Sequence, residues 1–598
     1  MKSSDERAPG ELDACLAELD AGEDFVSAFE QLLRDLPPDR SNRLMLLHRE
    51  GRGAWYPLLL GGSGTALFLG NAQSGTWLPL ALNGYRVVVV DRAAARVRFA
   101  RHRARAHARD AAWFVVAGDG SRLPFADGAF DVVVQEEGLP GTRGSEFAHD
   151  VAECRRVCRG ELVLTAENRL AYKRSTGRRG DFRVAPPWTW ARKVIAPRAG
   201  QRTLSGYRAA LAAPEFEPAR AFALYPHARD FTHVVSLEQP WPKLLLGPKE
   251  RKNKLKLVGH ALGLFPVLTP AFALIAARRD ARGGETRLDR ALEALAERIG
   301  EPRPRAEHWT ATRGNSAVVL TALEDSGAEP SDPRGRWALH LPMSPKEKYE
   351  LGRHSRNLRL LRERFPDFPA PEHLFTGEVE GMWLVVERRV EGLGAPQLSG
   401  DREFAARLFA RVARDYSALV TEAASPLGED DLAELVDAKF ELVGRYARLP
   451  ETRKSLERTR GEVRELLGGL VVPRVFYHAD LRGKHVRVRP DGEVVGYLDF
   501  GASEFADLPY FDLLHLVVHE RMIEEASGKA GHAWRVVRDG TGLREHERRA
   551  LDDYSARLAL PAEYRRAIET AYPVLVAAMA EKNWDYSRPH WLHRHFGF

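Results

Sequence analysis

The sequence predicts an α/β protein in which a doubly wound domain precedes a bilobal α+β domain. Three observations lead to this prediction. Apolar runs typical of buried strands alternate with helical patterns in the first half of the chain. Around residues 281–304 the composition changes to a charged helix and a stretch rich in proline and arginine. Beyond it, short strands come first, and helices predominate after Arg402. A chain of 598 residues is long enough for roughly two to four domains.

The elements of the first half follow from hydrophobic periodicity. Residues 1–60 are expected to form a helical extension, because leucine and phenylalanine recur there at helical spacing. The domain after it is expected to span residues 61–285. Its strands are near-continuous apolar runs, which favour a parallel sheet buried on both faces. The expected strands are 65–70, 86–91, 112–117 and 130–134, the expected helices are 77–83 and 93–108, and the apolar run 261–277 is expected to form a buried strand pair.

The second half is expected to contain a small mixed lobe over residues 300–392 and a larger helical lobe over residues 393–598. In the small lobe, alternating and apolar patterns indicate strands, and a long charged run with apolar spacing indicates a helix. The expected strands are 308–323, 337–341, 373–380 and 382–390, and the expected helix is 345–365.

Composition limits the classes of partner. The net charge of +6 is mild for this length, and arginine runs contain alanine and valine at helical spacing, so a solvated helix face is favoured over a nucleic-acid surface. The three cysteines lack the spacing of a zinc site and are interpreted as reduced thiols of a cytoplasmic protein. We expect no secretory signal, because residues 1–13 are charged and lack an apolar stretch. We expect no transmembrane segment, because the most apolar run is short and contains two prolines.

One ordered pair of motifs indicates phosphoryl transfer. His478, Asp480 and position 485 fit the spacing H-x-D-x-x-x-x-N, and Asp499-Phe500-Gly501 follows at a suitable distance. Phosphoryl transfer needs a carboxylate near the attacking hydroxyl and ligands that hold Mg²⁺ on the phosphates. We therefore expect Asp480 to orient the hydroxyl and Asp499 to hold Mg²⁺. His485 stands where asparagine is usual, and Mg²⁺ prefers oxygen, so His485 is either a metal ligand or a residue that holds the loop or a metal-bound water.

The stretch from His478 to Asp512 resembles the aminoglycoside phosphotransferase family of small-molecule kinases. It contains the catalytic loop, a hairpin over residues 486–496, the metal residue Asp499 and the segment Asp507–Leu513. The resemblance implies a bilobal protein-kinase-like fold, ATP and Mg²⁺ as cofactors, and a hydroxyl acceptor such as a sugar or a glycosylated metabolite. Some members carry histidine at the position of His485, and the aspartate of the last segment is structural in the family.

The small lobe matches that family less closely. Aligned on Leu341-Pro342, the usual strand lysine would stand at His340. The segment expected to form the glycine-rich loop contains a single glycine, Gly314. Ser316 or neighbouring backbone amides are therefore the candidates to bind a phosphate. Glu387 begins a segment that resembles the hinge, where backbone groups meet adenine. Two alternatives stay open: the lobe binds ATP through these residues, or it binds nucleotide weakly or not at all.

Acidic residues at strand ends suggest a second site in the first half. The first strand ends in the loop Gly70–Thr76, the second at Asp91 and the third at Asp119. In a doubly wound sheet, ligands bind outside the carboxyl ends of the strands. The carboxylate of Asp91 could accept hydrogen bonds from a ribose diol, and Asp119 could meet an adenine amino group. The alternative is that both are solvating carboxylates without a ligand.

The run Leu123–Val133, which reads L-P-F-x-D-x-x-F-D-x-V, resembles class I S-adenosylmethionine-dependent methyltransferases. The resemblance implies S-adenosylmethionine as cofactor, with Asp91 on the ribose and Asp119 near the adenine. The residues implied under the methionine end are Gly70, Asn71, Ala72 and Ser74. The chain departs from the family at Phe68, where an acid is usual, and at Ala72 and Ser74, where glycines allow the backbone to approach the ligand.

These patterns together predict a bifunctional transferase that combines an S-adenosylmethionine-binding domain with an ATP-dependent hydroxyl kinase, acting on a sugar or glycoside in polysaccharide or natural-product biosynthesis. A second hypothesis is a kinase whose first domain only binds a ligand or partner. The third is a non-catalytic or half-active scaffold in a biosynthetic complex. The intact Asp480 and Asp499 oppose this last hypothesis for the C-terminal half, and the altered glycine loop favours it for the N-terminal half.

Overall fold

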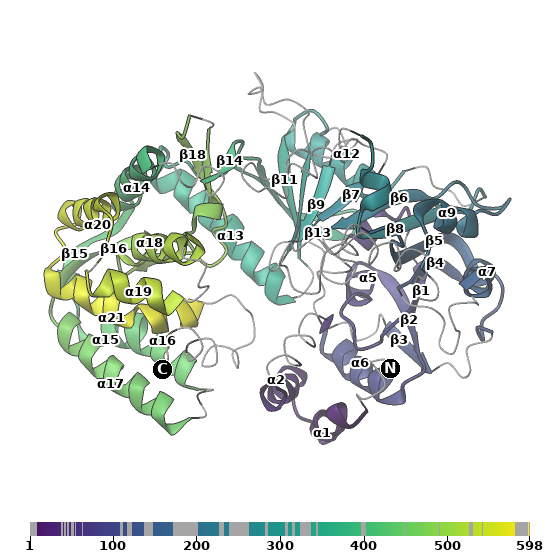
Figure 1. Cartoon of the computed structure of the whole chain (residues 1–598), viewed down its shortest axis with the longest axis horizontal. Helices are drawn as coiled ribbons and strands as arrows, with labels where there is room; N and C mark the ends of the chain where they lie inside the picture. The colour runs from purple at the N-terminus through teal and green to yellow at the C-terminus, as the bar shows by residue number, and fades with distance from the viewer. Residues whose placement is uncertain are drawn as a thin grey trace, which may run out of the picture. The chain divides into compact units, whose positions relative to one another are not determined.

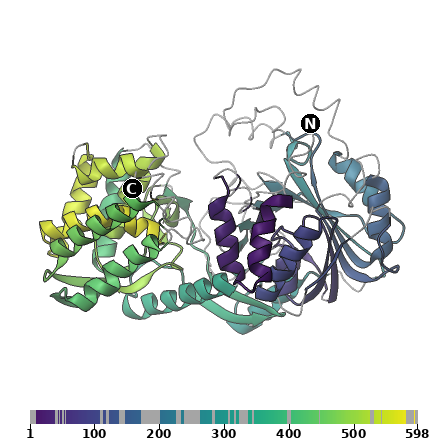
Figure 2. The ribbon, with the colours of Figure 1, turned by 90° about the horizontal axis from the view of Figure 1, so that it is seen from below.

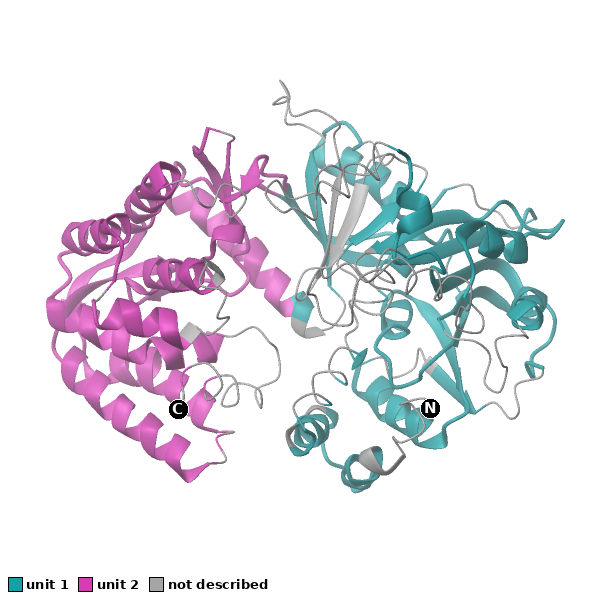
Figure 3. Ribbon diagram, in the orientation of Figure 1, with its two compact units in different colours: residues 1–348, 374–387 teal, residues 349–373, 388–598 magenta. Residues whose placement is uncertain are grey.

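The computed structural model describes most of the chain in two compact units. The described residues are 9–37, 40, 44, 47–48, 53, 55–62, 64–107, 112–116, 122–136, 147–171, 201–225, 233–237, 262–280, 285–304, 309–313, 317–322, 336–342, 345–395, 402–445, 447, 449–489, 491–524, 530–540, 542–579, 592 and 596. Unit 1 comprises residues 1–348 and 374–387, and unit 2 comprises residues 349–373 and 388–598 (Figure 3).

Unit 1 contains the predicted doubly wound sheet (Figure 1). Strands β1 to β5 run parallel in the order β3-β2-β1-β4-β5, and β8 joins β5 antiparallel. The strands are β1 (Gly64–Leu69), β2 (Tyr85–Asp91), β3 (Ala112–Val116), β4 (Phe130–Gln135), β5 (Cys158–Glu167), β6 (Arg220–Tyr225), β7 (His233–Ser236) and β8 (Ala271–Ala277). The helices are α1 (Pro9–Asp20), α2 (Phe25–Asp35), α4 (Tyr56–Leu59), α5 (Leu78–Leu82), α6 (Ala94–His107), α7 (Phe147–Val157), α9 (Leu204–Leu211), α11 (Phe265–Leu268) and α12 (Arg287–Ile299).

The strands are buried on both faces, as their apolar sequences predict. Along β1, Ala66 and Phe68 belong to one hydrophobic cluster, whereas Leu67 and Leu69 belong to another. Since successive side chains of a strand point to opposite faces, the two clusters lie on opposite sides of the sheet. The predicted α/β class is therefore confirmed. The helices α1 and α2 of the N-terminal extension lie side by side next to α6 (Figure 2).

The apolar run 261–277 differs from its prediction as a strand pair. Its second half forms β8, whereas Phe265–Leu268 forms the short helix α11. Pro266 explains the difference, because proline cannot donate to a strand ladder and is well suited to the first turn of a helix. Strand β8 has no partner strand among the described residues of the run itself. It pairs instead with β6, which lies more than 40 residues upstream.

The sheet of unit 1 continues beyond the doubly wound strands. Strand β7 pairs antiparallel with β9, which begins the strands expected for the small lobe. The described strands form one sheet of 13, in the order β12-β13-β11-β10-β9-β7-β6-β8-β5-β4-β1-β2-β3. The added strands are β9 (Trp309–Arg313), β10 (Ala317–Ala322), β11 (Trp337–Pro342), β12 (His373–Val379) and β13 (Met382–Arg388). The domain boundaries expected from composition stay predictions.

Arg287, at the start of α12, ties the two parts of this sheet together. Thr286 and Asp289 form a capping box that begins the helix, and Gly300, at φ 75°, ends it. The guanidinium of Arg287 is buried and donates to the carbonyls of Asn83 and Glu380, each at 2.7 Å. One side chain therefore holds the end of α5 and the β12–β13 turn.

Unit 2 is mainly helical and surrounds a single large hydrophobic cluster. Its strands are β14 (Leu393–Gly394), β15 (Val420–Pro426), β16 (Val471–Tyr477), β17 (Val486–Val488), β18 (Val494–Tyr497) and β19 (Glu504–Asp507). Its helices are α13 (Pro345–Arg364), which begins in unit 1, α14 (Arg402–Ser417), α15 (Glu429–Leu432), a π-helical turn (Ala433–Asp437), α16 (Ala438–Gly444), α17 (Pro450–Leu467), a 3₁₀ turn (Gly483–His485), α18 (Phe511–Glu524), α19 (Ala530–Arg538), α20 (Glu545–Arg557) and α21 (Ala562–Met579). None of the described helices is long and apolar enough to span a bilayer.

A buried ion pair joins α18 to α20. Arg521 donates from Nε to both carboxylate oxygens of Glu547, at 3.0 and 2.9 Å, and both side chains are almost fully buried. Removing one partner of a buried pair leaves an uncompensated charge. We expect Glu547→Ala to lower the free energy of unfolding of unit 2 by about 3–5 kcal/mol, measured by chemical denaturation of the full chain.

The matched control is Asp552→Ala on the same helix. Asp552 pairs with Arg565 at 2.8 Å, but Asp552 is exposed and Arg565 is only partly buried. Exposed pairs contribute about 0–1 kcal/mol, so this variant should unfold almost as the wild type does. Equal losses of stability in the two variants would contradict the prediction.

Candidate functional site

The candidate catalytic loop begins where β16 ends. The N–H groups of His478 and Ala479 donate to the two carboxylate oxygens of Asp512, at 2.7 and 2.9 Å. Ala479 has φ 73°, a left-handed conformation that is costly for a residue with a Cβ atom. Asp512 lies at the start of α18 and is buried. Its carboxylate therefore holds a strained backbone in place, and that backbone presents Asp480.

The two carboxylate oxygens of Asp480 differ: Oδ1 is paired with protein groups, whereas Oδ2 lies 3.8 Å from Nδ1 of His485, beyond hydrogen-bond distance. Its Oδ1 pairs with the guanidinium of Arg482 and lies 3.6 Å from Nε2 of His515. Its Oδ2 is buried and has no hydrogen-bond partner among the described residues. Burial by itself would raise the pKa of Asp480, but His515 and Arg482 lower that pKa far below its usual value. Asp480 is thus a fixed carboxylate with one oxygen available to accept a hydrogen bond.

His515 and Arg482 are functional candidates that the sequence reasoning missed. His515 comes from α18, and its Nδ1 lies 3.0 Å from the hydroxyl of Tyr572. If the Tyr572 hydroxyl donates to Nδ1, then Nε2 carries the hydrogen that faces Asp480. The hydroxyl of Tyr572 thus fixes the orientation of the His515 ring. The available signal was a histidine three residues after Asp512, the spacing that places two side chains on one helix face.

His485 and Asp499 face each other beside Asp480. His485 donates from Nδ1 to the backbone carbonyl of Asp480 at 2.7 Å, and its Nε2 lies 3.3 Å from Oδ2 of Asp499. Ligand atoms of Asp480, His485 and Asp499 all lie within 4.8 Å of one another. Burial lowers the pKa of His485, although the two nearby carboxylates oppose this shift. These donors fit a divalent cation, which the predicted roles of Asp499 and His485 require.

The Asp499-Phe500-Gly501 turn is held from α13. The N–H of Phe500 donates to Nδ1 of His354 at 3.2 Å, and Asn357 donates from Nδ2 to the carbonyls of Phe500 and Ser503, each at 3.0 Å. Asp499 itself has φ 72°. The sequence reasoning did not assign His354 or Asn357 a role. The signal that could have identified them was the spacing of three residues between two polar side chains of the predicted helix.

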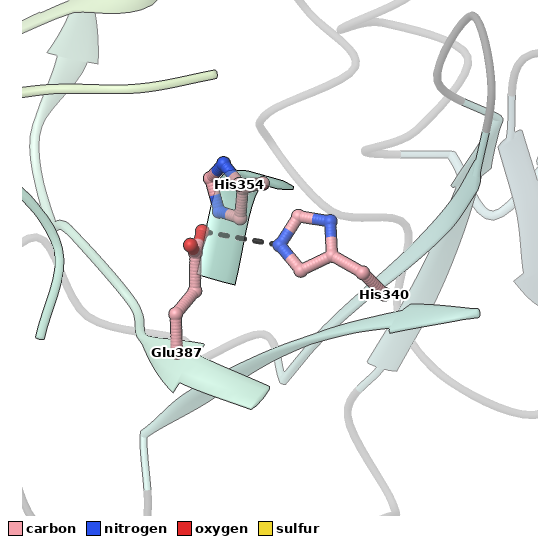
Figure 4. Close-up of side chains that lie close together, drawn as sticks. All are labelled: His340, His354 and Glu387. Carbon is pink, nitrogen blue, oxygen red and sulfur yellow. Dashed lines mark ion pairs between the residues drawn. The ribbon is translucent and has the colours of Figure 1, made fainter. Parts of the chain in front are cut away.

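Among the candidates of the small lobe, the structure brings His340 and Glu387 together. His340 lies on β11 and Glu387 on the neighbouring strand β13, and Nε2 of His340 is 3.1 Å from a carboxylate oxygen of Glu387 (Figure 4). Kinase small lobes usually pair a strand lysine with a glutamate of the next helix. Here an imidazole pairs with a strand glutamate instead. Ser316 lies outside the described residues. The roles predicted for these residues in nucleotide binding stay predictions.

In unit 1, Asp91 ends β2 as predicted, but its carboxylate is already bonded to protein. Its Oδ2 accepts the N–H of Ala72 at 2.9 Å. Its Oδ1 accepts the N–H of Ala93 at 2.8 Å and a guanidinium N–H of Arg96 at 2.7 Å. The residue is only 2% exposed. Three protein donors therefore share its two oxygens.

The loop after β1 is also filled by protein groups. Ala72, Ser74 and Thr76 are essentially inaccessible to solvent, and the indole of Trp77 donates to the carbonyl of Ala72 at 3.0 Å. The ring of Phe68, which stands where an acid is usual, lies so close to Gly70 that a Cβ there would be 3.0 Å from it. Asn71 accepts the N–H of Gln73 through its side chain, and Asp119 lies outside the described residues. These residues do not fit S-adenosylmethionine as they are arranged.

We therefore expect saturating S-adenosylmethionine to leave the thermal unfolding of the full chain unchanged. A ligand at about 100 times its Kd would add about 2.7 kcal/mol of stability. A saturable rise in Tm that Asp91→Ala abolishes would contradict this expectation and restore the ribose-binding role of Asp91. Arg208→Ala serves as the control, because Arg208 lies on α9, more than 100 residues after the Gly70–Thr76 loop.

Two family comparisons agree with this organisation. The methyltransferase domain family matches residues 67–164, and the phosphotransferase enzyme family matches residues 331–546. The first range contains the loop after β1 and Asp91, and the second contains Asp480, His485 and Asp499. Comparison with curated proteins gives no match.

Solved structures similar to the chain include three antibiotic phosphotransferases. Aminoglycoside phosphotransferase APH(3'')-Id from Streptomyces rimosus is 16% identical, with 45% of this chain and 92% of that chain covered and a TM-score of 0.30. Macrolide 2'-phosphotransferase type I is 17% identical, with 52% and 97% covered and a TM-score of 0.34. Aminoglycoside 2'-phosphotransferase-IIIa in its GDP complex is 14% identical, with 51% and 96% covered and a TM-score of 0.34. By its two family matches, the chain is a fusion of a methyltransferase-family domain with a domain of the phosphotransferase enzyme family, both of them transferase families.

Proposed function

We propose that the C-terminal part of the chain transfers the γ-phosphoryl group of ATP to a hydroxyl group of a small molecule. The observation that carries the proposal is Oδ2 of Asp480, which is buried beside the His485–Asp499 pair and has no hydrogen-bond partner among the described residues. A buried carboxylate oxygen without a partner is costly unless a ligand completes its hydrogen bonding. A substrate hydroxyl group supplies the donor that this oxygen lacks.

In the proposed reaction, Asp480 orients the acceptor hydroxyl and serves as its base. Its Oδ2 accepts a hydrogen bond from the acceptor hydroxyl, which points the oxygen lone pair at the γ-phosphorus. As the new P–O bond forms and the bond to the bridging oxygen of ATP breaks, the hydroxyl proton passes to Oδ2 and ADP leaves. Because Arg482 and His515 lower the pKa of Asp480, it is a weak base that takes this proton late. Such a weak base is sufficient, because in a loose transition state the acceptor hydroxyl loses its proton only after most of the bond to ADP has broken.

A divalent cation would be held by Oδ2 of Asp499 and Nε2 of His485. When bound, it neutralises charge on the phosphates. The backbone does the positioning: the N–H and carbonyl of Phe500, held by His354 and Asn357, fix the Asp499 turn. The left-handed conformations of Ala479 and Asp499 store strain at the two points where the carboxylates enter the site.

The acceptor belongs, in this proposal, to the sugars and glycosylated metabolites that the resemblance to aminoglycoside phosphotransferases implies, in polysaccharide or natural-product biosynthesis. The three cysteines are free and buried, which supports a reducing compartment such as the cytoplasm. The contacts around Asp91 favour, for the other half of the chain, the half-active alternative, in which the methyltransferase-family domain is not catalytic.

The test is phosphoryl transfer by the full chain in a panel of sugar and glycoside acceptors, with the phosphate ester detected by ³¹P NMR. We expect metal-dependent ATP consumption that rises with at least one acceptor class. Absence of both metal-dependent nucleotide binding and turnover would favour the scaffold hypothesis for the whole chain.

A further inference from the structure

The hydrogen bond at Nδ1 fixes the tautomer of His485. A backbone carbonyl can only accept, so the 2.7 Å contact with the carbonyl of Asp480 requires that Nδ1 carry the hydrogen. In the neutral ring, Nε2 is then an acceptor with its lone pair directed away from the loop. His485 is buried, so the ring is held in this orientation by its surroundings.

The group that faces this lone pair is a second acceptor. Nε2 of His485 lies 3.3 Å from Oδ2 of Asp499, and a carboxylate oxygen has no hydrogen to donate. Two acceptors at this distance repel each other unless a proton or a metal ion lies between them. Two ligands at right angles around Mg²⁺, each about 2.1 Å from it, are about 3.0 Å apart, so the observed separation suits a shared metal ion. The nearby carboxylate of Asp480 adds negative charge to the same space.

The donor set differs from the one that Mg²⁺ prefers. Mg²⁺ selects oxygen ligands, whereas imidazole nitrogen suits the divalent ions of the first transition row. Mn²⁺ is coordinated by both carboxylate oxygen and imidazole nitrogen, and it binds nucleotide phosphates as Mg²⁺ does. We propose that the His485–Asp499 site selects a divalent transition metal, with Mn²⁺ as the representative ion, over Mg²⁺. This inference rests on the proposed function, because the metal serves the same nucleotide.

The test measures metal binding directly. Mn²⁺ is titrated into the full chain in the presence of a non-hydrolysable ATP analogue, bound Mn²⁺ is followed by the loss of the free-ion EPR signal, and Mg²⁺ is added as competitor. His485→Asn replaces the imidazole by an amide oxygen and should shift the ratio of Mn²⁺ to Mg²⁺ affinity towards Mg²⁺ by about 10-fold or more. His532→Asn, an exposed substitution on α19, is the matched control and should leave the ratio unchanged.

A second measurement uses only the wild type, so that the inference can be tested even if His485→Asn fails to fold. Pulsed EPR of bound Mn²⁺ should show coupling to one ¹⁴N nucleus, the signature of a directly bound imidazole. Bound Mn²⁺ without that coupling, or equal metal ratios in wild type and folded His485→Asn, would overturn the inference and leave the kinase proposal intact. If neither metal supports binding of the nucleotide analogue, the kinase proposal fails as well.

Discussion

Asp480→Asn is expected to lower the rate of phosphoryl transfer by about 10²–10⁴-fold, the usual contribution of a positioned base. The amide keeps the shape of the side chain, but it cannot take the proton of the acceptor hydroxyl. The NH₂ group of the asparagine must also replace one of the two carboxylate oxygens. If it replaces Oδ1, it faces the donors of Arg482 and His515, and if it replaces Oδ2, it faces the substrate hydroxyl, so one hydrogen bond is lost in either orientation. The affinity for ATP with its metal should change much less, because His485 and Asp499 hold that ion.

The measurement is the steady-state rate with the best acceptor, beside calorimetric titration of the ATP analogue with metal. Asp553→Asn, an exposed residue of α20 with the same change in charge, is the control. A rate within about threefold of the wild type in a folded Asp480→Asn protein would exclude the role we assign to Asp480, since even the weakest general bases contribute more.

The parts of the fold that could be predicted are those that depend on the hydrophobic pattern within a single strand or helix. The strands β1, β2 and β4 are unbroken apolar runs, which have few alternatives to burial on both faces of a sheet. The pairing of β7 with β9 could not be predicted, because nothing in a strand's own sequence identifies its neighbour across more than 70 residues. The same holds for β8, which takes β6 as its partner.

For the candidate site too, the features set by local spacing could be predicted, and the contacts between distant side chains could not. Spacing placed Asp480, His485 and Asp499 together, since all three lie within one loop and hairpin. It could not show that Arg96 occupies the carboxylate of Asp91, since that depends on side-chain orientation at the start of α6. Nor could it assign His515 to Asp480 across 35 residues, because a histidine in an apolar helix is more often a core residue than a partner of a catalytic group.

Asp499→Asn is expected to abolish most metal-dependent nucleotide binding. Asparagine is the informative substitution because Asp499 has φ 72°, and asparagine adopts the left-handed conformation more readily than alanine does. The backbone turn that His354 and Asn357 support is thereby kept, and the change is confined to the charge. Losing even an indirect partner of a metal costs about 10–100-fold in affinity, so the loss of a direct carboxylate ligand should exceed about 100-fold.

Isothermal titration of the ATP analogue, with metal and with chelator, separates this effect from binding of the bare nucleotide. With chelator the wild type and Asp499→Asn should bind equally weakly, and with metal the wild type alone should bind tightly. Asp491→Asn, an exposed residue near the β17–β18 turn, is the control for charge and should match the wild type under both conditions. If Asp499→Asn binds the metal–nucleotide complex as tightly as the wild type, the carboxylate is not a ligand. The facing lone pairs of His485 and Asp499 would then require a proton between them instead of a metal ion, with His485 charged despite its burial.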